Sequence, residues 1–484
     1  MVRTLFCFFA LGISLQMIHF DESIGAADLT VEEAQRMAAP LVEQHRVVGL
    51  SVGIIDGSRR FSFHLGEARP GEGPPNDQTI YEIASISKVF TGVLLGIEAD
   101  QNPLTLLDEA GHDDSGVAVP DYQGQTINWL QLATHRSGLP RLPTNFGNAG
   151  ADNPYANYDS SKAIEFLQNY RLPRRPGTQY EYSNFAFAWL GHLLTLQDGA
   201  SSYERLLQKR ITRTLQMDDT VVNLSDRQKR RMAIPHSSFG TRASTWEFAD
   251  MPGAGGIRST TADMMKFMAA VLEPTQISAD RDLVEGIEMA WKEHQASSRE
   301  HFAMGLGWQI ARDGETRWHN GQTGGFHSVM FVNRKHQVGV VALTNTAEAR
   351  QVESMAENIV RRLAGGGDLA DLEPEHDSKP REITVDLATM QRLVGRYELS
   401  PTFVLDVHVV EDRLMVGITN QPTLQVYAKR KDRWFYKVVE AELDFDLPAV
   451  GPAKSLELIQ NGIRQTAMRT QPALFTKDEI GSAF

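Results

Sequence analysis

Two β-hairpins that lie far apart in the chain constrain its fold more than any other feature. Their four strands are expected at residues 50–55, 60–65, 328–332 and 337–343. Asp56-Gly57 separates the first pair, and this dipeptide suits the positive φ angles of a tight turn. A helix is expected before the first hairpin, at residues 30–44, and another after the second, at about residues 351–363. The simplest assembly is one antiparallel sheet with both helices on one face and a mostly helical insert at about residues 80–300.

The sequence pattern changes after residue 365, from helix-rich segments to short alternating apolar and polar segments, which predicts a second domain. A chain of 484 residues exceeds the usual size of one core, and three glycines followed by an acidic stretch indicate a linker at residues 365–382. We therefore expect an α+β domain at residues 28–364, with an antiparallel sheet flanked by terminal helices and a mostly helical subdomain. Short alternating segments predict a small all-β domain, barrel-like, at residues 383–484. Five aromatic residues are expected to pack in its core, with a ligand cleft as the less favoured alternative: Tyr397, Phe403, Trp434, Phe435 and Phe445.

The composition is that of a globular protein and argues against several classes. With 42% hydrophobic and 23% charged residues, the chain has neither the polar bias of disordered proteins nor the apolar excess of multispanning membrane proteins. A formal net charge of -13 and the lack of a cluster of basic and aromatic residues disfavour nucleic acid as a partner. We expect a monomer that does not bind nucleic acid.

Residues 1–27 have the pattern of a secretory signal peptide. Arg3 gives a positive flank, residues 5–18 are apolar, and residues 25–27 offer a small-residue cleavage site. The apolar stretch is shorter than the roughly 20 residues that span a membrane, so a retained N-terminal anchor is the less favoured alternative. We expect a secreted or periplasmic protein whose mature chain has no stable membrane span. The single cysteine, Cys7, lies in this segment, so the mature chain should contain no disulfide.

Ser85 and Lys88 are candidates for a nucleophile and its base. They lie three residues apart at the start of an apolar run, residues 89–97, which predicts a helix with both side chains on one face of its first turn. A serine hydroxyl needs a neighbouring base to remove its proton, and a lysine acts as that base when burial or nearby dipoles lower its pKa. The unpaired N–H groups of a helix N-terminus favour the neutral amine and can stabilise an oxyanion. A Ser-x-x-Lys motif alone is weak evidence, because an exposed helical lysine gives the same pattern.

Two Tyr-x-Asn segments are candidates for a proton relay. The segment that begins at Tyr155 lies in a polar, turn-rich stretch, whereas Tyr182 and Asn184 lead into an apolar helix at residues 185–194 that can hold them rigidly. A phenol beside a lysine can pass the nucleophile's proton to a leaving group, and an asparagine amide can bind both the lysine and a substrate amide. We expect Tyr182 to be the relay and Asn184 a substrate ligand. The alternative is a core tyrosine bonded to a backbone carbonyl.

A third segment, residues 318–326, contains His319, Gly321 and Gln322 just before an expected strand. Glycines let a strand edge come close to a bound substrate, whose backbone can then pair with it. The backbone N–H of Gln322 is a candidate oxyanion donor. His319 would lie beside the nucleophile as a group that titrates near neutrality, although a structural histidine at the start of a strand gives the same pattern.

These three segments, in this order, resemble the Ser-x-x-Lys, Tyr-x-Asn and Lys-Thr-Gly boxes of the class C β-lactamase family. The family also includes D-alanyl-D-alanine peptidases, D-aminopeptidases and family VIII esterases. Supporting matches occur at residues 50–52, 90–94, 132–140 and 253–260. The resemblance covers roughly residues 30–365, and the region after residue 383 resembles a β-rich domain appended to some members.

The resemblance implies a role for each box residue. Ser85 would be the acylated nucleophile, Lys88 its basic partner, and Tyr182 the general base and proton relay. Asn184 would bind substrate. The backbone N–H groups of Ser85 and Gln322 would form the oxyanion hole. His319 and Gly321 would contribute to substrate binding.

One departure from the family pattern affects the choice of substrate. His319 and Asn320 stand where the third box has its lysine and threonine. In the family that lysine helps to bind the substrate carboxylate, and a neutral histidine would do so less well. Acyl transfer remains possible, while strong β-lactam hydrolysis is in doubt. Whether His319 binds a carboxylate as a cation is left open.

The sequence therefore predicts a serine hydrolase that works through an acyl-enzyme on Ser85. The leading expectation is hydrolysis of β-lactam amides. D-alanyl-D-alanine carboxypeptidase, D-aminopeptidase or esterase activity is the alternative within enzymes, and a penicillin-binding receptor that is acylated without turnover is the alternative of another class. We expect a small-molecule or peptide substrate, no cofactor and no metal, because the histidines are scattered without ligand spacing.

Overall fold

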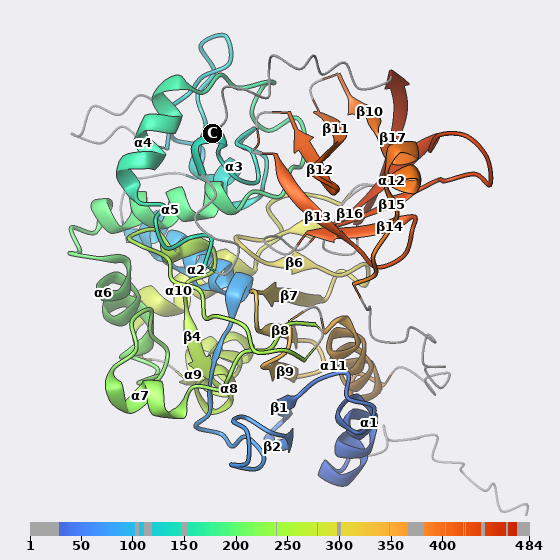
Figure 1. Cartoon of the computed structure of the whole chain (residues 1–484). Coiled ribbons are helices and arrows are strands. Elements are labelled where there is room, and N and C mark those ends of the chain that lie inside the picture. The colour runs from blue at the N-terminus through green and yellow to red at the C-terminus, as the bar shows by residue number, and fades with distance from the viewer. Residues whose placement is uncertain are drawn as a thin grey trace, which may run out of the picture.

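The structure is a computed structural model, and Figure 1 shows a large body of helices around a sheet with a smaller set of strands packed beside it. The described residues are 29–101, 106–110, 119–146, 153–238, 240–277, 279–297, 302–347, 349–365, 382–401, 403–419, 421, 423–436, 441–460 and 463–471. The expected signal peptide at residues 1–27 and most of the expected linker at residues 365–382 lie outside them. Within the described residues, no helix is long and apolar enough to cross a membrane.

One antiparallel sheet contains both expected hairpins. Its strands are β1 (Gly49–Asp56), β2 (Arg59–Gly66), β5 (Ala303–Met304), β6 (Gln309–Ile310), β7 (Thr316–Gln322), β8 (His327–Asn333) and β9 (Val338–Thr344). Their order is β2-β1-β9-β8-β7-β6-β5. Leu50 of β1 lies opposite Thr344 of β9, so the two hairpins share one sheet as predicted. The sequence did not predict β5, β6 and β7, because the first two are very short and β7 is rich in polar residues.

Helices cover both faces of this sheet. α1 (Val31–Glu43) and α11 (Arg350–Leu363) pack together on one face, as the sequence predicts, and Figure 1 shows them side by side. Thr30 and Glu33 form a reciprocal capping box that satisfies two backbone N–H groups at the start of α1. The opposite face of β1 and β9 is covered by α8 (Thr261–Leu272). The expected α+β arrangement is therefore confirmed.

The insert between β2 and β5 is mostly helical, as predicted. Besides α8, it contains α2 (Ser87–Gln101), α3 (Trp129–Ala133), α4 (Ser160–Asn169), α5 (Asn184–Gln197), α6 (Tyr203–Leu207), α7 (Asp226–Arg231), α9 (Pro274–Ile277) and α10 (Arg281–Trp291). It also contains a two-stranded sheet that the sequence did not predict, formed by β3 (Ile80–Glu82) and β4 (Arg258–Thr260). This small sheet holds the segment that leads into Ser85.

The C-terminal strands close into a barrel. They are β10 (Gly395–Ser400), β11 (Phe403–Val410), β12 (Arg413–Ile418), β13 (Leu424–Ala428), β14 (Arg433–Tyr436), β15 (Glu442–Phe445), β16 (Ser455–Gln460) and β17 (Ile463–Gln471), preceded by α12 (Leu387–Leu393). Closure comes from pairing of β10 with β17. The five aromatic residues expected in the core are all buried: Tyr397, Phe403, Trp434, Phe435 and Phe445.

The barrel is attached to the large body by polar contacts. Gln421 donates a hydrogen bond to Glu181 over 3.4 Å, and Arg350 at the start of α11 lies 3.6 Å from Glu442 of β15. Burial alone would raise the pKa of Glu442, but the charges of Arg350, Lys429 and Arg433 lower it to about 2. This carboxylate is therefore ionised at neutral pH. The predicted domain boundaries, an α+β domain at residues 28–364, a linker at 365–382 and an all-β domain at 383–484, stay a prediction.

The crossing of α2 and α10 depends on two glycines. A Cβ added at Gly96 would lie 2.4 Å from the carbonyl oxygen of Gly286, and one added at Gly286 would lie 2.3 Å from a side-chain carbon of Ile97. Contacts this short do not occur between real atoms, so one helix would have to move. The two backbones approach closely because neither glycine has a side chain.

Replacing Gly96 with alanine should therefore destabilise the protein, even though alanine is the better helix former. We expect a loss of about 1–3 kcal/mol, seen as a fall of several degrees in Tm in thermal unfolding followed by circular dichroism. Arg281→Ala, at an exposed position at the start of α10, is the control and should change Tm little. A Tm for Gly96→Ala equal to or above that of the wild type would contradict the packing argument.

Candidate active site

Ser85 and Lys88 lie within hydrogen-bond distance of each other. Ser85 belongs to a 3-10 turn (Ala84–Ile86) directly before α2, rather than to the first turn of that helix as the sequence predicted. Ala84 has a φ of 46°, a left-handed conformation that costs a non-glycine residue about 1–3 kcal/mol and is typical of functional sites. Lys88 Nζ donates to Ser85 Oγ over 2.9 Å.

Lys88 is completely buried, and a glycine-rich loop holds its amine. Its Nζ also donates to the carbonyl oxygen of Ala254 over 2.7 Å. That loop is fixed to α2, because Thr91 donates to the carbonyl oxygen of Gly253 over 2.7 Å and Ile257 N donates to Ser87 Oγ over 3.1 Å. The loop therefore aims the lysine amine at the Ser85 hydroxyl.

Tyr182 lies across the site from this pair. Lys88 Nζ is 5.0 Å from the centre of its ring, and the ring is buried. The following Ser183 is the N-cap of α5, accepting from Ala186 N and donating to the carbonyl oxygen of Pro140. The centre of the His135 ring lies 4.3 Å from that of Tyr182, and His135 Nδ1 accepts a hydrogen bond from Ser183 N over 3.1 Å, so His135 helps to hold this segment in place.

Asn184 begins α5, and its side chain contacts Tyr155, the less favoured of the two tyrosines that the sequence offered. Its Nδ2 donates to the hydroxyl of Tyr155 over 2.9 Å, while its Oδ1 is buried without a hydrogen-bond partner among the described residues. Tyr155 stacks on Phe248 at a centroid distance of 4.5 Å and lies against Trp246. The less favoured tyrosine is thus a support for Asn184, a role that sequence patterns did not reveal.

The third segment ends directly before β8, the strand that the sequence predicted, and its first part, residues 318–322, belongs to strand β7, which the sequence did not predict. The ladder to β6 involves Arg317 and Trp318, after which the strand passes the nucleophile. A Cβ added at Gly321 would lie 2.8 Å from Ser85 N and 2.5 Å from the carbonyl oxygen of Ile83, so only glycine fits. Asn320 points to the other face of the sheet and donates to Glu353 over 2.9 Å. His319 and Gly321 therefore lie on the side of β7 that faces Ser85 and Tyr182, and the Asn320 side chain does not.

His319 is held as a neutral acceptor. Burial and the charge of Lys88 lower its pKa to about 3. Its Nδ1 lies 2.5 Å from the carbonyl oxygen of Asn320, and because a carbonyl only accepts, the ring proton must be on Nδ1. Nε2 is then a buried lone pair without a partner among the described residues, and the ring lies 6.4 Å from that of Tyr182.

The profile of the Beta-lactamase family matches residues 34–364, more than half of the chain. The chain belongs to the Beta-lactamase family. The resemblance inferred from the three boxes is confirmed, and the protein is a serine hydrolase of the β-lactamase and penicillin-binding type.

Curated relatives of the family differ in how much of the chain they match. D-alanyl-D-alanine-carboxypeptidase/endopeptidase AmpH of Escherichia coli (strain K12) is 27% identical over 368 residues, covering 73% of this chain and 94% of that protein. Penicillin-binding protein 4* of Bacillus subtilis (strain 168) is 24% identical over 466 residues, 90% and 98% of the two chains. A beta-lactamase of Escherichia coli (strain K12) is 28% identical over 276 residues, which cover 57% of this chain and 69% of that protein. The Bacillus protein therefore matches part of the barrel as well.

Arg141 is a charged residue close to Tyr182 that sequence patterns did not reveal. Its guanidinium carbon lies 5.2 Å from the centre of the Tyr182 ring, and its side chain is 7% exposed. Both line a cavity between the catalytic body and the barrel, together with Tyr436 of β14. The Tyr436 hydroxyl is buried without a partner among the described residues, and burial raises its pKa well above the usual range although the charge of Arg141 opposes this. Across the parts of the chain that the structure describes, no cluster of side chains is suited to hold a metal ion.

The lowered pKa of His319 makes a prediction for pH dependence. The folded protein holds this ring neutral above about pH 3, so it gains no positive charge between pH 5.5 and 8. Binding of benzylpenicillin, which carries a carboxylate, to a Ser85→Ala variant should therefore have a nearly constant Kd over that range, measured by calorimetry. A Kd that tightens severalfold as the pH falls through 6.5, and that no longer does so in His319→Gln, would mean that His319 binds the carboxylate as a cation.

Proposed function

We propose that Ser85 attacks the amide carbonyl of a D-alanyl peptide and forms an acyl-enzyme that water then hydrolyses. The hydrogen bond from the buried Lys88 amine to Ser85 Oγ carries this proposal, because it places the amine directly at the oxygen of the nucleophile, where it can take part in the transfer of the serine proton. The backbone N–H groups of Ser85 and Gln322 stabilise the oxyanion. Tyr182 relays the proton to the leaving amine, and Asn184 Oδ1 accepts a hydrogen bond from a substrate amide.

A peptide suits this site better than a β-lactam does. The neutral His319 offers a lone pair instead of a cation, which weakens the hold on a carboxylate next to the reacting amide. A peptide backbone can pair with the part of β7 that follows the β6 ladder, and a bicyclic β-lactam has fewer groups for such pairing. AmpH, a carboxypeptidase/endopeptidase by name, matches this chain over 94% of its own length. β-Lactam hydrolysis, the expectation from sequence, is the second candidate and is favoured by the relatives named beta-lactamase.

We also propose that this chain is exported from the cytoplasm. We propose that residues 1–27 direct export and are then removed, on the strength of the charged flank, apolar stretch and small residues in that order. The mature protein would then act outside the cytoplasm on small peptides as a monomer.

Intact-protein mass spectrometry tests the proposed chemistry. The mature chain is incubated with a chromogenic cephalosporin and, separately, with acetyl-D-Ala-D-Ala, while product release is followed. We expect D-Ala release and a lasting cephalosporin adduct on Ser85. Rapid cephalosporin hydrolysis without an adduct would contradict the peptidase and favour β-lactamase activity. A lasting adduct without any peptide or ester turnover would favour a penicillin-binding receptor that is acylated but does not turn over.

Ser85→Ala is the matched variant for that experiment. It should remove both adduct and turnover, leaving less than about a thousandth of the wild-type rate, because oxyanion donors alone rarely give more. Its circular dichroism spectrum should equal that of the wild type. Substantial residual activity would contradict the assignment of the nucleophile.

We further propose that Arg141 supplies positive charge to Tyr182 in place of the third-box lysine. It lies 5.2 Å from the phenol ring, whereas His319 is neutral. The guanidinium would favour the phenolate form that Tyr182 passes through as a base. Arg141 is thus a positioning residue, because it acts through Tyr182.

Arg141→Met should lower kcat/KM for acetyl-D-Ala-D-Ala by about tenfold or more and move the rising limb of the pH profile to higher pH, because the phenolate loses a nearby cation. Arg141→Lys keeps the charge and should recover much of the rate. A uniform loss in both variants with an unchanged pH profile would indicate a structural role only.

A further inference from the structure

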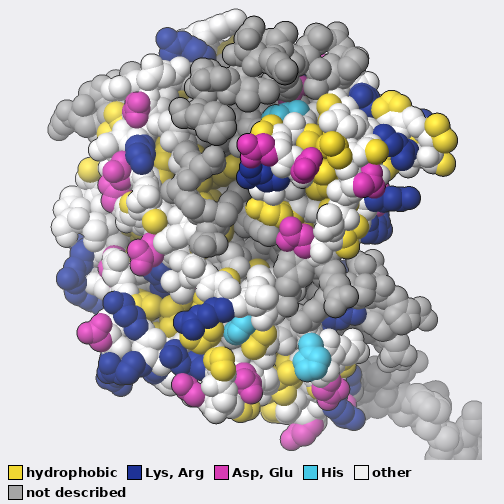
Figure 2. Space-filling model, viewed as in Figure 1, with side chains coloured by type: hydrophobic (Ala, Val, Ile, Leu, Met, Phe, Trp, Pro, Cys, Tyr) yellow, Lys and Arg dark blue, Asp and Glu magenta, His cyan; other side chains and the backbone are white. Residues whose placement is uncertain are grey.

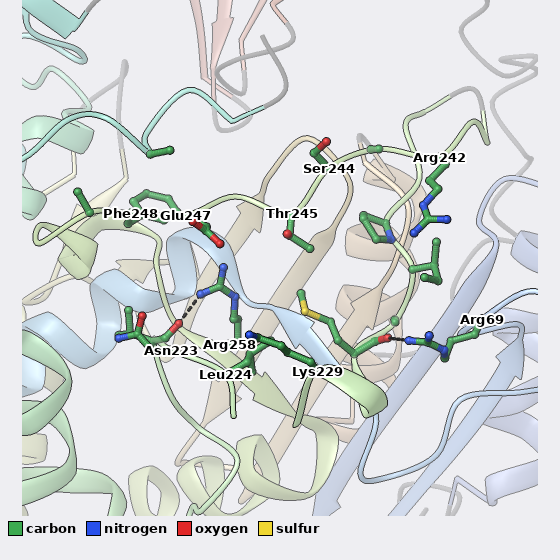
Figure 3. A pocket seen from close by; sticks show the side chains of 18 residues that line it. Arg69, Asn223, Leu224, Lys229, Arg242, Ser244, Thr245, Glu247, Phe248 and Arg258 are labelled. Carbon is green, nitrogen blue, oxygen red and sulfur yellow. Dashed lines mark hydrogen bonds between the residues drawn. The ribbon is translucent and has the colours of Figure 1, made fainter. Parts of the chain in front are cut away.

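A cavity of about 770 Å³ lies in the large body, and none of the residues proposed for catalysis lines it. Its walls come from the segment that contains α7 and from residues 242–249, and Figure 3 shows Arg258 between Asn223 and Thr245 in its interior. A volume of this size accommodates a small organic ligand or part of a peptide.

The charge around this cavity is mainly positive. Its described walls include the cations Arg69, Lys229, Arg242 and Arg258 and one acid, Glu247. Figure 2 shows Lys and Arg side chains gathered over α7 on the same side of the molecule. Three of the four cations have an acidic neighbour. Arg69 Nε is 3.2 Å from Glu72, Lys229 is 3.8 Å from Asp226, and Arg258 is 3.7 Å from Glu82.

Two of these cations, Arg242 and Arg258, differ in how accessible they are to a ligand. Arg242 is exposed and has no acidic partner among the described residues. Arg258 is 7% exposed, and its two terminal nitrogens donate to the carbonyl oxygens of Val222 and Trp246. Its Nε is buried without a partner in the described part of the chain. The cavity thus combines a buried guanidinium with an available one.

Two aromatic side chains, Phe248 and Trp246, lie between this cavity and the segments around Ser85 and the end of β7. Phe248, which lines the cavity, lies against Gly255, where an added Cβ would be 3.1 Å from the ring and 3.8 Å from the carbonyl carbon of Ala84. An added Cβ at Gly324, just after β7, would be 2.9 Å from Trp246 Nε1. That indole N–H is buried without a partner among the described residues, so it is a further donor on this path.

The direction of a bound peptide follows from the catalytic geometry. A peptide that pairs with β7 runs along the strand between His319 and Gln322. Its leaving group must lie near Tyr182, whose ring is 6.4 Å from that of His319. The acyl part therefore continues past Gln322 toward Gly324 and Trp246, and the chain neighbours of Trp246, Thr245 and Glu247, line the cavity.

We propose that this cavity is a subsite for a carboxylate on the acyl side of the substrate, so that the preferred peptide is acidic on the N-terminal side of the scissile bond. This inference rests on the proposed function for the direction of the peptide. Arg242 binds the carboxylate in the mouth of the cavity, and Arg258 and Lys229 contribute positive potential.

Two peptides test the proposal, acetyl-Glu-D-Ala-D-Ala and acetyl-Gln-D-Ala-D-Ala, which differ in one charge. The wild type should hydrolyse the Glu peptide with a kcat/KM about five- to tenfold higher. Arg242→Glu should remove this preference and leave the Gln peptide within about twofold. Arg227→Glu is the matched control, because it makes the same charge change at an exposed position of α7 that does not line the cavity, and it should keep the preference.

Equal rates for the two peptides in the wild type, or equal losses in Arg242→Glu and Arg227→Glu, would overturn the proposal in favour of general surface charge. Calorimetry on Ser85→Ala with acetyl-Glu-D-Ala and acetyl-Gln-D-Ala separates this inference from the proposed function, because it needs no turnover. If the wild type cleaves neither peptide, the proposed function fails. A binding preference for the Glu compound that Arg242→Glu removes would still support the subsite, and equal binding would overturn it.

Discussion

The buried amine of Lys88 is the feature around which the rest of the site is built. A lysine side chain that is removed from water loses solvation worth several kcal/mol unless other groups replace it. Here Ser85 Oγ at 2.9 Å and the Ala254 carbonyl at 2.7 Å take the place of water. Because Thr91 and Ser87 of α2 fix the loop that carries Ala254, the same helix positions both the amine and its acceptors. A shift of that loop would therefore alter both the stability of the core and the approach of Lys88 to Ser85.

The distribution of charge around this amine differs from what a third-box lysine would produce. The cation of Lys88 and burial together keep His319 neutral, and the same two causes keep the pKa of His135 well below its usual value, with burial the larger. The second positive charge close to Tyr182 is Arg141, which comes from the helical subdomain. Two positive charges, Lys88 and Arg141, thus lie near the Tyr182 ring, while strand β7 presents the lone pair of His319 Nε2. Such a site favours proton transfer over the binding of a carboxylate at β7.

The barrel contributes residues to the surroundings of Tyr182. Tyr436 shares a cavity with Arg141 and Tyr182, and Gln421 reaches Glu181, the residue before Tyr182. The ionised Glu442 draws Arg350 of the catalytic body toward the barrel. Some of the contacts of the barrel with the body therefore lie close to Tyr182. A relative that matches 90% of this chain shares part of both regions.

Local patterns in the sequence were enough to predict the two hairpins, the two helices that flank them, the aromatic core of the barrel and the three boxes. Each of these depends on neighbours in the chain, through periodicity, turn residues or an i, i+3 spacing. The sequence did not predict β7 as a strand, the 3-10 turn at Ser85, or the support that Tyr155 gives to Asn184. It also gave no sign of Arg141 or of the basic cavity. These features arise where segments far apart in the chain meet, and burial, which sets the charge of His319 and the reach of each guanidinium, exists only once those segments have packed together.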